Sequence, residues 1–533
     1  MPGVMALEQR LGLPWVKPVA LLALPALVIG VAMYPNIQLA LMPSSLALAI
    51  VVACAAGFVV TGHPQLVVLL PAVAACLPSR QAGFAAYAIA LTYFIAEHGG
   101  RRLVRPLDAA DRLLIAVMVW ATMSWMINLG TQTDFWSLPV FVLTFLTPWL
   151  LLFVARAAPW SAGDTRLVLG LWLGLVMVQL VPALVKPAVT GELSAYMVPF
   201  SLIELTGVGL LRTLAATESF DVTSGTTASA HYLGVLLTLA LVLLVAIMAA
   251  RRHWLPLLIV ATGYVFLMTD SKHVIVAAFP AGLVFLWRVV RPLLRPGASR
   301  VLVMALLIFV AIAGPWAAVR AYRILSAGSW RPYAELASLN AKAQLVKRTA
   351  GLLGRKDLNT WIGYGAGSYA TRAATIRASA VLYKEGNELP EFIPAHTGDA
   401  YRSVAYDLYT TEQADAVKFR SGVLTLPFSS AVGVVAEFGL LGTLLVLAFF
   451  AALSGAGYAA WRRIGDPPLR RAAGAMTGFA MPFLFVLGFF DSYLEQPGVT
   501  GPMIVVAILA LSGAGAAPEP VQSGEARGVQ LAR

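Results

Sequence analysis

The sequence predicts an all-α polytopic membrane protein with 12 to 14 transmembrane helices and one large, partly helical polar loop. Hydrophobic residues make up 59% of its 533 residues and charged residues only 12%, about half the share in soluble proteins. Apolar runs of roughly eighteen residues or more recur along the chain, each long enough to cross about 30 Å of hydrocarbon as a helix. Because these runs are continuous rather than alternating, helices are favoured over barrel strands.

The expected spans extend from near the first residue to near the last. They lie near residues 18–34, 40–60, 64–80, 82–98, 113–130, 137–156, 167–185, 232–250, 255–269, 274–290, 301–319, 429–460, 472–490 and 503–515. The run between residues 66 and 78 is short and flanked by proline, so a re-entrant segment is an alternative there. The first run, Pro18–Tyr34, is followed by no small-residue cleavage site and is expected to remain as a helix.

These spans divide the chain into five regions. N-terminal spans occupy residues 1–166, core spans with a first polar loop (186–231) occupy 167–319, a large polar loop occupies 320–427, C-terminal spans occupy 428–515, and a disordered tail occupies 516–533. The start of the large loop, residues 333–353, has helical spacing of Leu and Ala, with Lys342, Lys347 and Arg348 on the other face. This pattern predicts an amphipathic helix that lies against the membrane or against the protein's own surface.

Arginine-rich short loops predict the orientation. The loops at 99–112, 251–254, 289–300 and 462–471 all fall on one side, and the short turns on the opposite side contain no Lys or Arg. Positive charge favours the cytoplasm, so both termini are predicted to be cytoplasmic and both long polar loops to lie outside. The net charge of +12 therefore reflects topology rather than nucleic-acid binding. Cys54 and Cys76 lie inside apolar runs, which favours core packing over a disulfide or a metal site.

Ionisable residues within or at the rim of a span are costly and are therefore candidates for function. Four groups lie at the predicted outer rim: Glu204 and Arg212, then His231, then the turn Asp270-Ser271-Lys272-His273, and finally Glu437. Arg212 could instead snorkel to headgroups, and Lys272 could anchor a helix end. Glu437 is either a satisfied structural carboxylate or the partner of an arginine. Two cations on one membrane face suit an anionic lipid headgroup, because Arg binds phosphate oxygens in a fork.

A glycine-rich string, Trp361-Ile-Gly363-Tyr-Gly365-Ala-Gly367-Ser-Tyr369, is superficially like a nucleotide-binding loop. It follows no hydrophobic strand, and the predicted topology places it outside the cell, where no ATP pool exists. A dinucleotide or phosphate-loop interpretation is therefore rejected.

Taken in order, these features resemble the O-antigen ligase and polymerase superfamily of membrane glycosyltransferases. The resemblance is carried by Arg212 before a span, the turn Asp270-Ser271-Lys272, the glycine string in the large loop, and Ser429-Ser430 followed by Ala436-Glu437-Phe-Gly-Leu-Leu-Gly442. It covers roughly residues 167–450. Two departures stand out. Lys272 replaces the arginine common in the family, which loses the bidentate fork, and Ser429-Ser430 replaces a histidine found in ligases and many relatives.

The resemblance implies a fold related to the GT-C class and residence in a bacterial inner membrane, with the large loop in the periplasm. It implies metal-independent, inverting transfer of sugars carried on undecaprenyl pyrophosphate, without a cofactor. Membrane lipids, a flippase and chain-length or export proteins are the implied partners. Arg212 and Lys272 would stabilise the leaving pyrophosphate, and Asp270, His231 or Glu204 would serve as base. The implied substrate-binding residues are Gly363, Gly365, Gly367, Ser368, Ser430 and Glu437.

The residues leave three functions open. A polysaccharide polymerase is favoured over a ligase, because the ligase histidine is missing. A flippase for lipid-linked oligosaccharides belongs to a different class; it would place charges along a central cavity and needs no large outer loop. Here the candidate residues gather at one face, and the large loop exceeds a hundred residues, which favours the polymerase.

Overall fold

The computed structural model describes residues 44–77, 79–104, 106–189, 227, 230–251, 256–269, 271–290, 341–382, 393–408, 429–463 and 465–512. Within these ranges the regular elements are all helices, apart from one isolated bridge between Leu129 and Thr133. The expected spans at 18–34 and 301–319 lie outside the described residues. So do the first polar loop, apart from Thr227 and the ends of its neighbouring helices, and the tail.

Two groups of helices precede the large loop. The first contains α3 (Ser44–Val60), η1 (Pro64–Leu69), α4 (Leu70–Ala75), α5 (Arg80–Val104), α6 (Ala109–Ile127), α7 (Ser137–Phe141), η2 (Val142–Leu146), α8 (Thr147–Ala155) and α9 (Ala162–Val189). The second contains α12 (Ala230–Arg251), α13 (Pro256–Met268), α14 (Lys272–Phe285) and η4 (Leu286–Val290).

The large loop contributes α17 (Ala341–Leu353), α18 (Leu358–Ile362), α19 (Arg372–Leu382), α20 (Asp399–Val404) and η6 (Tyr406–Leu408). We call this group the cap. The chain then continues through α22 (Ser430–Arg462), α23 (Pro468–Leu487), η7 (Tyr493–Glu495) and α24 (Pro497–Leu511).

Six helical stretches are long and apolar enough to cross a membrane: Ala109–Ile127, Ser137–Ala155, Ala162–Ala183, His231–Ala250, His273–Val290 and Ser430–Arg462. Three shorter apolar helices accompany them, Leu46–Val60, Pro64–Ala75 and Pro497–Leu511. The protein is therefore an all-α polytopic membrane protein, as the sequence predicts. The piece Pro64–Ala75 begins as a 3₁₀ helix and covers only about 20 Å, which is too short to cross hydrocarbon alone.

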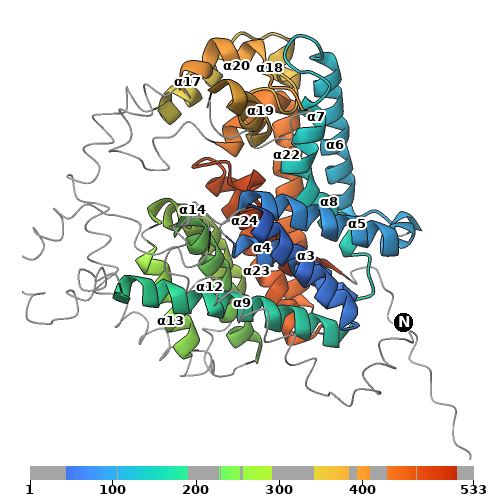
Figure 1. Ribbon diagram of the computed structural model, residues 1–533, viewed down its shortest axis with the longest axis vertical. Coiled ribbons are helices and arrows are strands. Elements are labelled where there is room, and N and C mark those ends of the chain that lie inside the picture. The colour runs from blue at the N-terminus through green and yellow to red at the C-terminus, as the bar shows by residue number, and fades with distance from the viewer. Residues whose placement is uncertain are drawn as a thin grey trace, which may run out of the picture.

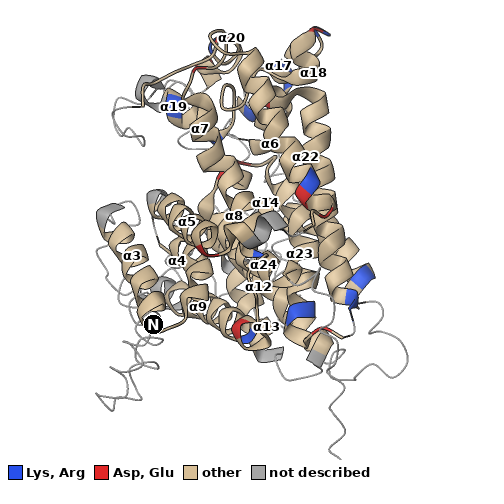
Figure 2. Ribbon diagram, turned by 90° about the vertical axis from the view of Figure 1, so that its right-hand side faces the viewer, with Lys and Arg blue, Asp and Glu red and all other residues tan. Residues whose placement is uncertain are grey.

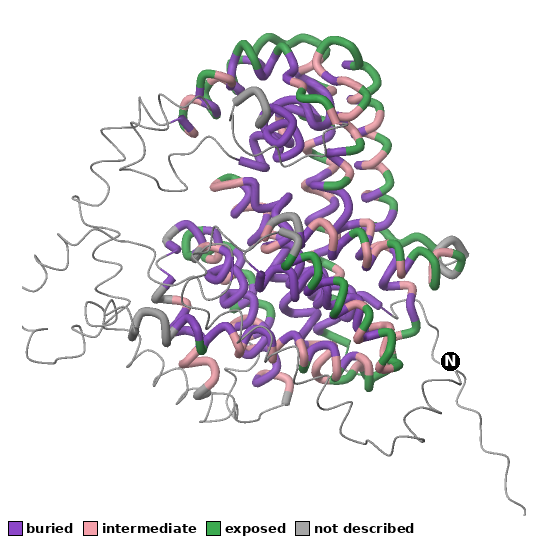
Figure 3. Tube along the Cα trace, viewed as in Figure 1, coloured by how far each residue is buried: buried purple, intermediate pink, exposed green. Residues whose placement is uncertain are grey.

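The helices form a tall molecule with the cap at one end (Figure 1). α22 and α6 stand side by side and lead from the bundle to the cap, where α18 packs on α22. α23 and α24 lie in the interior, where Met503 to Ala510 are fully buried. The trace through the middle is accordingly buried, and exposed residues follow the periphery (Figure 3). A helix that is apolar on all sides is expected at the centre of such a bundle.

The cap has a small hydrophobic core of its own. Leu345 and Leu352 of α17 are buried with Tyr369 and Tyr401, and Val432 of α22 completes the cluster. Lys347 on the other side of α17 is exposed. The described part of the predicted amphipathic helix thus lies against the protein's own surface, which decides between the two alternatives that the sequence leaves open.

Charged residues are sparse over the bundle (Figure 2). At the end of α6 away from the cap, Asp108 forms a capping box. The buried guanidinium of Arg156 pairs with Asp108 and Asp111 at that end. A buried arginine needs such partners because an unpaired buried charge is strongly destabilising.

Candidate functional site

The glycine loop (residues 363–371) and the start of α22 form one unit. Tyr364 N donates to the Ala436 carbonyl (2.9 Å) and Gly365 N to the Glu437 carbonyl (3.0 Å). Gly363 has φ +84°, and a Cβ added there would lie 2.1 Å from the Glu437 carbonyl oxygen. The two backbones therefore meet where only glycine fits. The glycines and the Glu437 segment, which carry the family resemblance, are spatial neighbours.

The Glu437 carboxylate lies fully buried inside the glycine loop. It accepts hydrogen bonds from the amides of Gly367 (2.6 Å), Tyr369 (2.9 Å) and Thr371 (3.1 Å), and from the Thr371 hydroxyl (2.7 Å). Backbone N–H groups that converge in this way form an anion-binding nest. Glu437 is thus a satisfied carboxylate, the first of the two alternatives. The glycine loop is like a nucleotide-binding loop in that its backbone amides bind an anion. Here, however, that anion is the Glu437 carboxylate of the same chain.

α6 holds this unit from the other side. Trp120 Nε1 donates to the Phe438 carbonyl (2.9 Å), and Ser124 Oγ donates to the Ile362 carbonyl (2.8 Å). Asn128 Nδ2 donates to the Gly363 carbonyl (3.1 Å). Ser368 is buried and donates within the loop, to the Gly365 carbonyl (2.6 Å). The structure therefore brings Gly363, Gly365, Gly367, Ser368 and Glu437 together in a buried, internally bonded arrangement.

α19 is tied to the turn between α6 and α7. Arg377 is buried and donates from Nη2 to Asp134 Oδ2 (2.6 Å) and to the Pro394 carbonyl (2.7 Å). Burial alone would raise the pKa of Asp134, but hydrogen bonds from Arg377 and Ser137 and the charge of Arg377 lower it below its usual value. Sequence reasoning missed this pair, because its members are 243 residues apart.

A second polar cluster lies where α12, α14 and η7 meet. His231 Nδ1 lies 3.2 Å from Ser271 Oγ, and His273 Nε2 lies 2.7 Å from the Tyr493 hydroxyl. The two imidazole rings are 4.5 Å apart and nearly perpendicular. Gly234 makes this approach possible, because a Cβ there would lie 2.9 Å from Ser271 Oγ. We call His231, Ser271, His273 and Tyr493 the histidine cluster.

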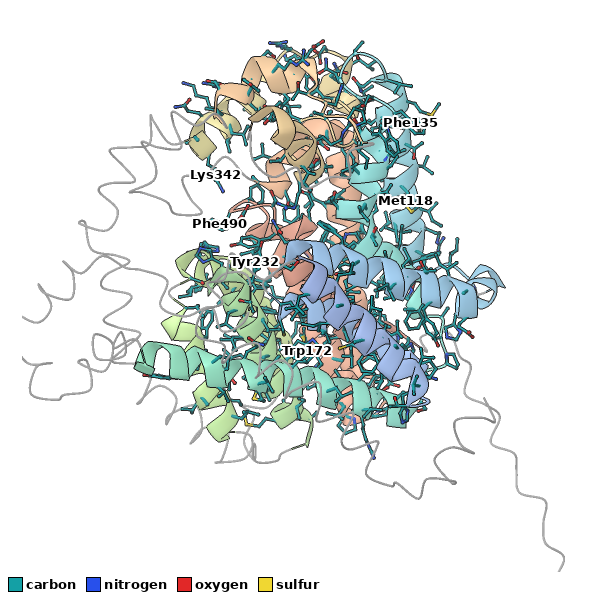
Figure 4. All side chains as sticks on the ribbon, in the orientation of Figure 1. Met118, Phe135, Trp172, Tyr232, Lys342 and Phe490 are labelled. Carbon is teal, nitrogen blue, oxygen red and sulfur yellow. The ribbon has the colours of Figure 1, made fainter. Side chains whose placement is uncertain are left out.

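Lys342 reaches from the cap to the edge of this cluster. Its ammonium donates to the Phe490 carbonyl, and the two residues face each other across the space between α17 and the bundle (Figure 4). Burial lowers the pKa of Lys342 to about 7, although the nearby Asp491 carboxylate opposes this shift. The ammonium is also close enough to His273 for their charges to interact.

Ser430 and Glu495 connect the glycine loop to the histidine cluster. Leu494 N donates to Ser430 Oγ (3.2 Å), and Arg372 N, at the end of the glycine loop, donates to Glu495 Oε2. Burial raises the pKa of Glu495 to about 8, and the negative charge of Glu437 adds to this rise. The turn that carries Tyr493 is therefore fixed to the loop that Glu437 organises.

Of the predicted catalytic residues, only His231 has a side chain that the structure describes. Arg212, Glu204 and Asp270 lie outside the described residues, and Lys272 is described only by its backbone, as the first residue of α14. His231 lies beside Ser271, as their shared place at the predicted rim suggests. Among the described side chains, no group of three or more His, Cys, Asp or Glu is arranged to hold a metal ion.

Lys342 and Tyr493 are members of this region that sequence reasoning did not select. In the sequence, Lys342 is only one of several basic residues on the polar face of α17. Tyr493 lies in a short turn, without a neighbouring motif. One sequence signal could have grouped these residues, namely the predicted side of the membrane. The predicted topology places the turn before His231, the turn at 270–273 and the turn at 491–502 on the same side as the large loop.

No protein-family model matches the chain, and no curated protein matches it.

Proposed function

We propose that the protein is a glycosyltransferase of the bacterial inner membrane that polymerises oligosaccharide repeat units carried on undecaprenyl pyrophosphate. The observation that supports this most directly is the meeting of His231, Ser271, His273 and Tyr493 with Lys342 from the cap. This cluster lies beside Lys272, the residue that the family resemblance assigns to the pyrophosphate. The proposal includes the predicted orientation, with the cap in the periplasm and both termini in the cytoplasm.

The chemistry needs a cationic environment and a base. The acceptor hydroxyl attacks the anomeric carbon of the donor sugar, the bond from that carbon to the pyrophosphate oxygen breaks, and undecaprenyl pyrophosphate leaves with the electron pair. Fixed cations stabilise the negative charge that develops on it, and Lys272 and Arg212 are assigned to this task. The proton of the acceptor hydroxyl passes to a base within hydrogen-bonding reach, for which His231, Asp270 and Glu204 are the candidates.

We add Lys342 to these candidate residues because it is buried in the structure. Its burial brings the pKa to about 7, so the amine exchanges protons readily near neutral pH. It is therefore suited either to pair with the pyrophosphate as a cation or to accept the hydroxyl proton as a neutral amine. In both roles the cap completes the site, because α17 carries this residue to the bundle.

The test is a reaction with purified protein in nanodiscs. A repeat unit linked to undecaprenyl pyrophosphate is supplied together with EDTA, and the products are separated by size. A ladder of lengthening glycans is expected. Transfer of a single glycan to an added lipid A core acceptor would instead indicate a ligase. Movement of a fluorescent lipid-linked glycan between leaflets, without any new glycosidic bond, would contradict both and indicate a flippase.

Substitutions then test the assigned cations. Arg212→Ala and Lys272→Ala are each expected to abolish the ladder while the protein still inserts and melts normally. Lys347→Ala serves as the matched control, because Lys347 is exposed on the far side of α17. Normal ladders from both of the first two variants would show that the pyrophosphate role is assigned to the wrong residues.

A further inference from the structure

Large apolar side chains are exposed around the cap end of α6. Met126 and Ile127 end the helix, Leu129 follows, and the Phe135 side chain in the turn before α7 is 67% exposed. Phe135 points away from the body of the molecule at the level of the cap (Figure 4). A turn outside a membrane would be expected to present polar residues to water, so this exposed apolar surface requires a partner.

α18 extends the same surface within the cap. Leu358 is 64% exposed and Trp361 is 51% exposed, although both lie in a helix that is firmly held. Asp357 caps α18 by accepting from Thr360 N, and the adjoining Ile362 carbonyl is bonded to α6. The exposure of these two side chains therefore follows from a fixed position of the helix.

The position of α18 is fixed relative to two membrane-crossing helices. Its Trp361 backbone packs against the kink of α22, because a Cβ on Gly439 would lie 2.5 Å from the Trp361 carbonyl carbon. Beyond the first turn of α6, the exposed side chains of this helix are all apolar, as are those of α22 just after the kink: Ile115, Val119, Met123, Leu440, Leu441 and Leu444. This apolar band, which in a membrane faces lipid, adjoins α18, because Gly439, the residue before Leu440, contacts the Trp361 backbone.

Basic residues lie at the edge of this band. Arg355 and Lys356 precede Asp357, the capping residue of α18, and both are exposed. Tryptophan and basic residues together are characteristic of the boundary between acyl chains and headgroups, where the indole ring lies at headgroup depth and a cation reaches the phosphates. A second copy of the chain or another protein would not require this order of apolar band, tryptophan and cations along the membrane normal.

We propose that α18 and the turn between α6 and α7 form an interfacial anchor that is embedded in the leaflet on the cap side. Leu358, Trp361 and Phe135 enter the boundary between acyl chains and headgroups, and Arg355 and Lys356 contact lipid phosphates. The ligand is the bilayer itself. The inference depends on the membrane-protein fold and on the position of α18, and it holds whether or not the proposed glycosyltransferase activity is correct.

The anchor determines the depth of the glycine loop. Gly363 follows α18 directly, and its carbonyl is bonded to Asn128 at the end of α6. With α18 at the boundary, the buried nest around Glu437 lies at headgroup level. The cap is then held on the bilayer surface at one edge by the anchor and on the bundle at the other edge by Lys342.

Fluorescent labels test this proposal in the full-length protein in nanodiscs. Leu358→Cys and Trp361→Cys are labelled with an environment-sensitive dye, and Lys347→Cys on the exposed side of α17 is the matched control. Cys54 and Cys76 are buried, so unsubstituted protein gives the background. Because the replaced side chains are exposed, melting temperatures close to that of the parent are expected, which verifies folding.

The readout is quenching by spin-labelled lipids. Labels at 358 and 361 are expected to be quenched about twofold more strongly than the label at 347 by a nitroxide near the headgroup. Iodide in the water is expected to give the reverse order. Equal quenching at all three positions would overturn the proposal. So would efficient disulfide cross-linking of Leu358→Cys between two copies without lipid quenching, which would assign the surface to self-association.

Discussion

At the residue scale, Glu437 shows how this chain stabilises a buried carboxylate. Burial removes the water that would solvate the charge, and this is strongly unfavourable unless hydrogen bonds replace it. Three amides and one hydroxyl supply those bonds. The same bonds fix the path of residues 367 to 371, so the carboxylate and the loop require each other.

Glu437→Gln is expected to destabilise the protein by about 2–3 kcal/mol, because an amide offers one acceptor oxygen and presents an NH₂ group to amides that need an acceptor. Thr371→Val removes only one of the four donors and is expected to cost about 1 kcal/mol. Melting temperatures in the same detergent compare the two variants. A Gln variant as stable as the parent would show that the loop does not depend on this charge.

For Lys342, the proposed role in holding pyrophosphate predicts that anion binding depends on pH. Its pKa of about 7 lies below the ordinary value of 10.5, so the amine loses its proton as pH rises through 7. Binding of inorganic pyrophosphate at this residue requires the cation, and affinity is expected to fall by up to about tenfold per pH unit above 7. The Asp491 carboxylate and the His273 ring lie close enough to this amine to interact with it electrostatically.

Lys342→Arg isolates the contribution of the Lys342 amine, because Arg stays protonated while the pyrophosphate titrates as before. The variant is expected to bind pyrophosphate with a distinctly flatter profile between pH 6 and 9, measured by calorimetry in nanodiscs. Lys347→Arg should keep the parent profile. Identical profiles for the parent and Lys342→Arg would exclude Lys342 from the anion site.

At the element scale, the kink of α22 couples the bundle to the cap. Gly439 has φ +65°, and the chain of Trp361 to Gly363 crosses α22 at that point. A straight helix would carry the Glu437 side chain elsewhere, because the kink sets the direction of the turn that bears it. The segment around Gly363 and the segment around Gly439, which are far apart in the sequence, therefore pack closely against each other.

Gly439→Ala is expected to destabilise the protein by more than about 1–3 kcal/mol, since a backbone with φ +65° and ψ −171° is accessible essentially to glycine alone and costs about that much for other residues. The new methyl group would also clash with Trp361. Gly455→Ala is the matched control within α22, because no atom lies within 4 Å of a Cβ at that position. It is expected to be neutral or stabilising by up to about 1 kcal/mol. Equal melting temperatures for the two variants would argue against a strained kink.

The elements that the sequence predicted best are the apolar ones. The run at 429–460 became α22 (Ser430–Arg462), and the run at 232–250 became α12 (Ala230–Arg251). Helix ends were less accurate. α5 continues to Val104, beyond the expected end at 98, because a polar terminal turn carries no hydropathy signal. Hydropathy reports the contact of a segment with lipid, and the regular backbone follows from that contact.

The contacts of the candidate site were not predictable in the same way. The carboxylate of Glu437 binds residues 66 to 70 positions away, and Lys342 binds a carbonyl 148 positions away. Local periodicity holds no information on such pairs. His231 and Ser271 were placed on the same rim because topology alone decides the side of the membrane, and topology can be read from arginine-rich loops.

At the scale of the whole molecule, the cap is joined to the bundle by polar contacts of opposite pH response. The Asp134 carboxylate has a lowered pKa, so its contribution to stability is present above the unfolded value of 3.8 and is lost as pH falls through the folded value. Glu495 has a pKa raised from 4.5 to about 8. Its contribution is therefore present in full below 4.5 and is lost as pH rises through 8.

The parent protein is therefore expected to lose stability as pH rises from about 5 to about 8, because Glu495 ionises in the unfolded chain over this range but stays protonated in the folded protein. Glu495→Gln keeps an oxygen acceptor for Arg372 N and carries no charge, so its melting temperature is expected to change much less over that range. Glu97→Gln replaces an exposed carboxylate and is expected to follow the parent. If Glu495→Gln and the parent decline in parallel, another group governs the alkaline side of the profile. If only the parent declines, the protonated Glu495 carboxyl group, which accepts from Arg372 N of the cap, governs the alkaline side of the profile.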